Sequence, residues 1–176
     1  MSDIVADMLF LTRADRGAVA RRSAPVSLAE QAWTVVEFHE AMLESTGQKV
    51  QVSGDAQLPI DAGLVRRAMS NLLGNACRYA VPGSAISIVI ERQADAAWVK
   101  VLNRGEPIAP GVLPHLFERF FRAERSRTDS SHHHGLGLAI VAAIARMHGG
   151  QTHASSQAGV TEVGFSLAAP PQPAEA

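Results

Sequence analysis

The segment from residue 65 to residue 80 combines a helical apolar repeat with a polar stripe, and it constrains the fold more than any other part of the chain. A surface helix normally carries Glu, Lys and Arg on its outer side. Here an Asn pair flanked by Arg offers amide oxygens to a hard cation and cationic groups to the anion that carries it. At about 3.6 residues per turn the polar stripe holds Arg67, Asn71, Asn75 and Arg78. The opposite side holds Val65, Met69, Leu72, Leu73, Ala76 and Ala80.

The composition is typical of one soluble domain. A chain of 176 residues can bury a full core. Its formal charge of −1 gives no reason to expect nucleic acid or an anionic membrane as a partner. The single cysteine, Cys77, excludes an intramolecular disulfide and is expected to pack inside the helix. No apolar run reaches the roughly 18 residues that cross a bilayer, so we expect no direct membrane contact by this segment.

The first part of the chain reads as a helix followed by a linker. Ile4, Met8 and Leu11 repeat at helical spacing within residues 1–14. This stripe is too short to bury itself against anything local, so we interpret the helix as part of another module. Residues 15–26 break the pattern and are predicted to be a linker.

The rest of the chain mixes helices with strands. Ser27 and Glu30 form a capping box that starts a helix running to about Ser45, and Asp61 can cap the asparagine-bearing helix. Helices and antiparallel hairpins in this order predict an α+β, two-layer α/β sandwich with a mixed sheet and three main helices on one face. Strands are expected at 49–52, 85–91, 97–102, 152–155 and 162–167, a last helix after 135–138, and a disordered tail over 169–176.

A glycine-rich turn precedes the last helix and could bind an anion. Gly135-Leu136-Gly137-Leu138 would present bare backbone amides beside the positive end of a helix. Tight packing also produces such turns. The dinucleotide-binding interpretation fails because no third glycine follows at the required spacing, and the P-loop interpretation fails because no Gly-Lys-Ser/Thr is present.

Two further loops offer polar groups. Asn103 begins the loop that follows the predicted strand at 97–102 and lies close to Gly105, where it could read the edge of a planar base, although Asn-x-Gly also suits a plain turn. The run from His132 to His134 could bind a metal. Three adjacent histidines cannot easily face one ion, so we favour a solvated loop there.

The order of these motifs resembles the catalytic, ATP-binding domain of sensor histidine kinases, in the ATPase superfamily that includes gyrase and mismatch-repair ATPases. The resemblance covers about residues 27–168 and implies a Bergerat-type fold. The N box resembles Asn71-Leu-Leu-Gly-Asn75-Ala-Cys-Arg78-Tyr79, the G1 box Asn103-Arg-Gly105-Glu-Pro107, the F box Leu116-Phe117-Glu-Arg-Phe120-Phe121-Arg122, and the G2 box Gly135-Leu-Gly137-Leu138. The amino-acid sequences of the G1 and F boxes are most similar to those of the heavy-metal sensor kinases.

This resemblance implies ATP and Mg²⁺ as cofactors. Asn75 would hold the Mg²⁺, Asn71 would support it, and Arg78 would neutralise phosphate charge. Residues 122–134 would form a mobile lid over ATP, with Arg122, Arg125 and Arg127 as candidates for γ-phosphate contact. The remaining nucleotide-binding residues would be Tyr79, Asn103, Gly105, Ile108, Gly135, Leu136, Gly137 and Leu138.

Two positions depart from the common family pattern. Asn103 stands where an acid usually accepts a hydrogen bond from the adenine amino group, and an amide oxygen can also accept that bond. Pro107 replaces the second glycine of the G1 box and stiffens the loop. Both departures resemble the metal-sensor branch.

The phosphoacceptor histidine of the family is also absent from this chain. Residues 1–14 look like the end of the second dimerisation helix, without the first helix that would carry the acceptor. The resemblance therefore implies the cytoplasmic part of an inner-membrane receptor in a bacterial two-component system. Its implied partners are its own dimerisation domain and a response regulator.

Three alternatives remain open on the sequence. The domain could be a non-catalytic nucleotide-binding module, with Asn103 and Pro107 marking loss of turnover. It could be a serine kinase of the anti-sigma type, against which the F box argues. It could also bind metal directly through His132 to His134.

Overall fold

The computed structural model describes residues 2–122 and 134–170. The helices are α1 (Ser2–Asp15), α2 (Leu28–Phe38), α3 (Glu40–Thr46), α4 (Ala62–Tyr79) and α5 (Gly137–Met147), with a 3-10 helix η1 at Leu113–His115. The strands are β1 (Pro25–Ser27), β2 (Lys49–Ser53), β3 (Gln57–Pro59), β4 (Ala85–Gln93), β5 (Ala96–Arg104), β6 (Thr152–Gln157) and β7 (Val160–Ala168). None of the helices in these residues is both long and apolar enough to cross a membrane.

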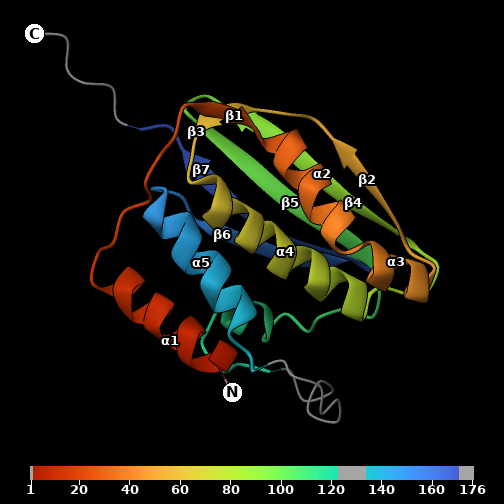
Figure 1. Cartoon of the computed structure of the whole chain (residues 1–176). Helices are drawn as coiled ribbons and strands as arrows, with labels where there is room; N and C mark the ends of the chain where they lie inside the picture. Colours follow the sequence, from red (N-terminus) through yellow and green to blue (C-terminus); the bar gives the residue numbers. More distant parts are fainter. Residues whose placement is uncertain (1, 123–133, 171–176) are drawn as a thin grey trace, which may run out of the picture.

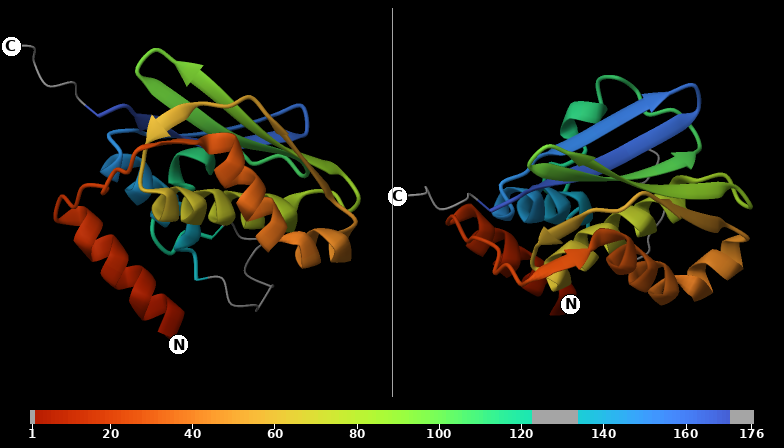
Figure 2. Two further views of the ribbon diagram at one scale, coloured as in Figure 1. Left: turned by 45° about the horizontal axis from the view of Figure 1, so that its top comes forward. Right: turned by 90° about the horizontal axis from the view of Figure 1, so that it is seen from above.

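The main sheet has five strands in the order β2-β4-β5-β7-β6. β2 pairs with β4 in parallel, and the other neighbours are antiparallel. Helices α2, α4 and α5 cover one face of this sheet, while the other face carries no helical layer (Figures 1 and 2). The predicted two-layer sandwich with a mixed sheet is thus confirmed.

The core lies between the helical layer and the sheet. The apolar side of α4 is buried, with Val65, Met69 and Leu73 each 0% exposed. Alternate residues of β4 and β5 face the same interior, including Ile86, Ile88, Val99 and Val101. Since burying one large aliphatic side chain stabilises a fold by about 1.5–3 kcal/mol, this interface fixes the position of α4. The polar stripe of α4 is thereby turned away from the core.

The helix predicted from residue 27 to about residue 45 is two helices. Ser27 caps α2 as expected, because its side chain accepts a hydrogen bond from the Glu30 amide at 3.1 Å. The helix then breaks at His39, whose Nε2 lies 2.7 Å from the hydroxyl of Ser70 on α4. Gly47, with φ 66°, ends α3 in the left-handed conformation.

The predicted linker over residues 15–26 contains a strand and a well-anchored arginine. β1 pairs with β3 in a two-stranded antiparallel sheet that the sequence did not indicate. The guanidinium of Arg22 donates to the carbonyl oxygens of His148 at 3.0 Å and Ala168 at 2.5 Å. This segment therefore packs against the domain.

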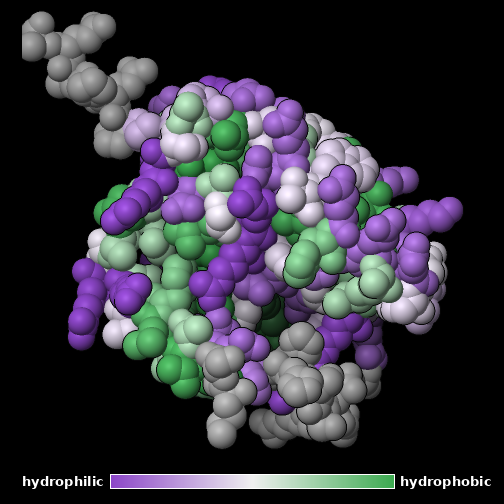
Figure 3. All heavy atoms as spheres, viewed as in Figure 1, coloured by the Kyte–Doolittle hydropathy of each residue, from purple (hydrophilic) through white to green (hydrophobic). Residues whose placement is uncertain are grey.

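Helix α1 packs on α5 (Figure 1). Leu11 is 1% exposed and belongs to the core, whereas Val5 and Leu9 on the outer side are 60% and 56% exposed. Hydrophobic side chains accordingly show along the outer side of α1 (Figure 3). Asp15 at its end forms an ion pair with Arg119. The apolar stripe of α1 thus does find a local partner.

Candidate nucleotide-binding site

The structure joins the asparagine stripe of α4 to the beginning of α5. The side-chain amide of Asn71 donates to the carbonyl oxygen of Gly137 at 3.2 Å. A Cβ built on Gly137 would lie 3.7 Å from the Asn71 side chain, an ordinary van der Waals distance, so the two residues are in direct contact here. Asn75 lies one turn further along the same stripe and is half-buried. The surface is hollowed beside α4 and the N-terminal end of α5 (Figure 3).

The N-terminal end of α5 offers backbone amides. The preceding residue, Leu136, makes no side-chain capping hydrogen bond, so no side chain of that residue occupies the amides of the first turn. Leu136 is 2% exposed and its side chain belongs to the core, which leaves only its backbone for a ligand. Leu138 is partly buried against the core. Free amides beside a positive helix end suit an anion.

Gly135 is required by its backbone conformation and by its neighbours. Its φ is +72°, and a Cβ there would lie 2.9 Å from the backbone of Phe120. The Gly135 carbonyl accepts a hydrogen bond from the Phe120 amide at 2.9 Å. The F box and the G2 box are therefore in direct contact.

Asn103 continues the buried face of β5. Residues Ala97, Val99 and Val101 alternate into the core, and Asn103 takes the next position on that face at 6% exposed. Its neighbour on β7 is Thr161, which is also buried. An amide at the end of an apolar row places a polar group at the margin of the core, where it can recognise a ligand in a partly dry setting.

Gly105 brings the end of β5 against the end of α4. It forms an isolated antiparallel bridge with Ala80, and a Cβ at Gly105 would lie 2.4 Å from the carbonyl oxygen of Tyr79. Three residues on, the Ile108 amide donates to the hydroxyl of Ser156 at 2.9 Å. Ser156 and Thr161 extend this polar region, and nothing in their sequence context indicated it.

The arginines of the stripe have different surroundings. Arg78 is half-buried, with its guanidinium carbon 5.7 Å from the centre of the Tyr79 ring. Tyr79 itself is 48% exposed. Arg67 pairs with Asp7 of α1 at 2.5 Å and lies over the Phe10 ring. Arg67, although it lies on the predicted stripe, thus contacts α1.

His148, which carried no sequence prediction of function, holds the two helices of the site together. It is fully buried at the end of α5, and its Nδ1 donates to the Ile144 carbonyl oxygen at 2.8 Å. Its Nε2 accepts a hydrogen bond from the Asp61 amide, at the cap of α4, at 3.1 Å. Burial lowers the pKa of His148 below its ordinary value, which keeps the ring neutral and able to accept this bond.

A divalent cation at this site would depend on the nucleotide for most of its ligands. Residues 2–122 and 134–170 contain no group of three His, Cys, Asp or Glu side chains arranged to hold a metal ion. Mg²⁺ commonly takes one or two protein oxygens together with phosphate oxygens and water. An asparagine amide beside a helix N-terminus fits that pattern. The expected lid residues Arg125 and Arg127, and also His132 and His133, lie outside the described residues.

Residues 60–172 match the family of histidine kinase-, DNA gyrase B- and HSP90-like ATPases. The chain is 41% identical over 149 residues to the sensor protein CzcS of Cupriavidus metallidurans, covering 85% of this chain and 31% of that protein. It is 38% identical over 170 residues to the sensor histidine kinase CusS of Escherichia coli K12, covering 96% of this chain and 35% of that protein. The chain therefore spans about a third of the length of the curated relatives it matches.

Solved structures show the same fold. Acinetobacter baumannii histidine kinase AdeS superposes with a TM-score of 0.80 at 20% identity, over 97% of this chain and 79% of that one. Full-length ShkA in complex with AMPPNP superposes with a TM-score of 0.78 at 24% identity, over 96% of this chain and 36% of that one. These likenesses show the fold, and the family match over residues 60–172, which is more than half of the chain, places the chain in the family of histidine kinase-, DNA gyrase B- and HSP90-like ATPases.

Proposed function

We propose that this domain binds Mg-ATP and transfers its γ-phosphoryl group to a histidine on a dimerisation domain. The observation that carries the proposal is the hydrogen bond from Asn71 to Gly137, which brings a row of amide side chains against an uncapped helix N-terminus. That arrangement pairs oxygen ligands for a cation with amide donors for the phosphates that the cation accompanies.

The residues of the chain would contribute positioning and charge neutralisation, as phosphoryl transfer generally requires. When bound, Mg²⁺ would supply positive charge against the phosphates. Asn75 would offer its amide oxygen to the metal, with Asn71 fixing the adjoining backbone. Arg78 would neutralise phosphate charge, while the amides around Gly137 would hold the phosphate oxygens.

The base would lie against the polar end of β5. Asn103 would accept a hydrogen bond from the adenine amino group through its amide oxygen. Gly105 would let the end of β5 lie directly against the end of α4, because a Cβ there would collide with the Tyr79 carbonyl oxygen. Tyr79 and Ile108 would flank the nucleotide, and Leu136 and Leu138 would anchor the phosphate-binding turn in the core. No residue in this scheme needs to be a covalent nucleophile.

The whole protein is proposed to be larger than this domain. We infer that α1 is the end of a dimerisation helix, that residues 15–26 link it to the catalytic part at 27–168, and that 169–176 form a tail. The acceptor histidine would lie on the dimerisation domain, and a response regulator would receive the phosphoryl group. The likeness to CzcS and CusS supports a heavy-metal sensor kinase with this domain on the cytoplasmic side.

Two measurements test the proposal. Calorimetry should show ATP binding that depends on Mg²⁺. With ATP labelled at the γ position, the chain alone should remain unlabelled, because transfer needs an acceptor in near-contact with the phosphate and the acceptor histidine is proposed to lie on the dimerisation domain. A supplied dimerisation domain should become labelled slowly, since the high effective concentration of a covalent link is missing. The label should be acid-labile and base-stable.

Different outcomes would support the alternatives. Binding without transfer to any supplied acceptor would indicate a non-catalytic nucleotide-binding module. Acid-stable label would indicate a hydroxyl acceptor and favour a serine kinase.

A further inference from the structure

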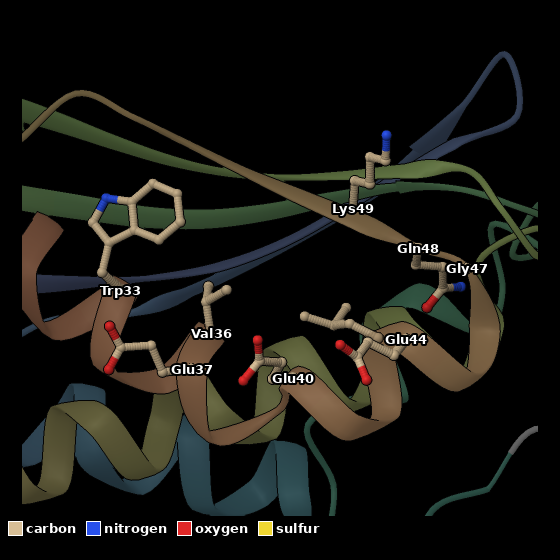
Figure 4. A pocket seen from close by; sticks show the side chains of 9 residues that line it. Trp33, Val36, Glu37, Glu40, Glu44, Gly47, Gln48 and Lys49 are labelled. Atoms are coloured by element: carbon tan, nitrogen blue, oxygen red, sulfur yellow. The ribbon is translucent and has the colours of Figure 1, made fainter.

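A groove lies between the helices α2 and α3 and the strand β2, with a volume of about 550 Å³. Its helical wall carries Trp33, Val36, Glu37, Glu40 and Glu44, and Lys49 borders it on the strand (Figure 4). None of these residues belongs to the nucleotide-binding motifs. The groove is therefore a second concave feature, formed by a different pair of elements.

The groove exposes apolar surface that the fold does not use. Trp33 is 48% exposed, and it points from α2 toward β2 together with Val36 (Figure 4). An exposed tryptophan beside further apolar surface, rimmed by polar side chains, is a common mark of an interaction site.

The strand that borders the groove is the edge of the sheet. β2 has a strand neighbour, β4, on one side only within the described residues. Its free edge offers backbone amide and carbonyl groups to another extended chain. The side chains of an added strand would alternate between the helical layer, where Val50 and Val52 of β2 pack on the core, and the open face of the sheet.

The negative charge of the groove favours a basic ligand. The side-chain carboxylates of Glu37, Glu40 and Glu44 have no hydrogen-bond or ion-pair partner within residues 2–122 and 134–170. Lys49 points away from the helices, so it does not neutralise them (Figure 4). Arginine or lysine side chains entering from an added strand would meet these carboxylates, and their aliphatic stems or guanidinium groups would pack on Trp33.

We propose that β2 and the α2–α3 groove bind a basic, extended segment of a partner protein, which adds to the sheet as a further strand. Backbone pairing with β2 provides the affinity that is independent of sequence. Basic side chains directed toward Trp33, Glu40 and Glu44 provide the selectivity. This surface is separate from the nucleotide site, so the proposal does not depend on the kinase activity.

The test uses a dye-labelled short peptide of alternating arginine and valine, with blocked ends, and measures its fluorescence anisotropy with the whole chain. Two control peptides accompany it: one replaces arginine by glutamate, and the other carries N-methyl groups on alternate backbone amides. Only the unmodified basic peptide should bind, and its affinity should fall as salt rises.

Substitutions identify the surface. Trp33→Ala and Glu40→Lys should each lower the peptide affinity at least about tenfold. Matched controls are Glu30→Lys, an exposed acid on α2 that does not line the groove, and Trp98→Ala, on the other face of the sheet. Both controls should bind the peptide as the unchanged chain does, and all four should keep their affinity for Mg-ATP.

Three results would overturn the proposal. The first is no binding of the basic peptide at low salt by the unchanged chain. The second is equal binding of the N-methylated peptide, which would exclude strand addition. The third is an equal loss of affinity in Trp98→Ala and Trp33→Ala, which would place the peptide elsewhere. Thermal unfolding of each variant confirms that it is folded.

Discussion

Asn75 is half-buried on the polar side of α4, so its side chain is not part of the packing that holds the helix on the sheet. Asn75→Ala should leave the fold intact, because removing this side chain opens no core cavity. It should weaken Mg-dependent ATP binding at least about tenfold, or ~1.4 kcal/mol. Calorimetry with and without Mg²⁺ measures this. An unchanged Mg-ATP affinity would mean that Asn75 is not the metal ligand.

Asn103→Asp should preserve or raise the affinity for ATP. A carboxylate is a stronger acceptor for the adenine amino group and cannot turn a donor toward it. Preference for ATP over GTP should remain, because guanine presents a carbonyl at that edge. Since residue 103 is 6% exposed, the charge should also lower the melting temperature of the protein without nucleotide. If ATP binding is lost, Asn103 uses its donor side or does not touch the base.

At the level of residues, the sequence predicted the features that follow from a local helical or strand period. Helical spacing predicted the stripe of α4, and strand alternation predicted the strand before position 103, although Asn103 was assigned to the following loop and β5 in fact continues to Arg104. Contacts between distant segments had no such signal. The hydrogen bond from Asn71 to Gly137 and the one from Ile108 to Ser156 depend on the order of elements in space. The orientation of Arg67 toward α1 likewise depends on how α1 packs against the domain, which the periodicity of the sequence does not indicate.

Among the elements, the turn before α5 depends most on one residue type. Gly135→Ala should destabilise the fold by about 1–3 kcal/mol, because alanine at φ +72° is strained and its Cβ would press on the Phe120 backbone. Mg-ATP affinity should fall as well, since the displaced turn carries the amides of α5. Denaturant unfolding and calorimetry measure the two effects.

Gly111→Ala is the matched control for this change. A Cβ at Gly111 would meet nothing within 4 Å, and its φ lies outside the left-handed range. This variant should behave as the unchanged chain in both measurements. Equal effects at positions 111 and 135 would show that general loop stiffness, and not the geometry of the turn, is responsible.

Long periodic elements were predicted well and short ones poorly. Helices α4 and α5 and strands β4, β5 and β7 lie where alternation and helical spacing indicated. The pair β1 and β3 was missed because three residues are too few to show a period. The break at His39 was missed because α2 and α3 carry compatible apolar positions on either side, and only the bond to Ser70 marks it.

For the whole molecule, the buried His148 predicts a pH dependence of stability. An unfolded histidine gains a proton near pH 6.5, whereas burial lowers the pKa of folded His148, so below that pH the unfolded state binds more protons. The free energy of unfolding should therefore fall from about pH 6.5 downward, by at most ~1.4 kcal/mol per pH unit, until the folded pKa is reached.

Urea unfolding at a series of pH values, compared with His148→Gln, isolates this effect. His39, whose pKa burial also lowers, is present in both proteins and cancels in the comparison. The difference between the two curves should shrink as the pH falls. Parallel curves over this range would show that His148 gains its proton equally in the folded and unfolded states.

Leu136 couples the packing of the core to the position of the proposed phosphate-binding turn. Its side chain is 2% exposed in the core, while its backbone stands at the start of the helix that is proposed to hold phosphate. A substitution that repacks the interior near Leu136 will therefore change ligand affinity, even at residues that no ligand reaches. A replacement for Leu136 would therefore have to fill the same space in the core and leave the backbone at the start of α5 where it is.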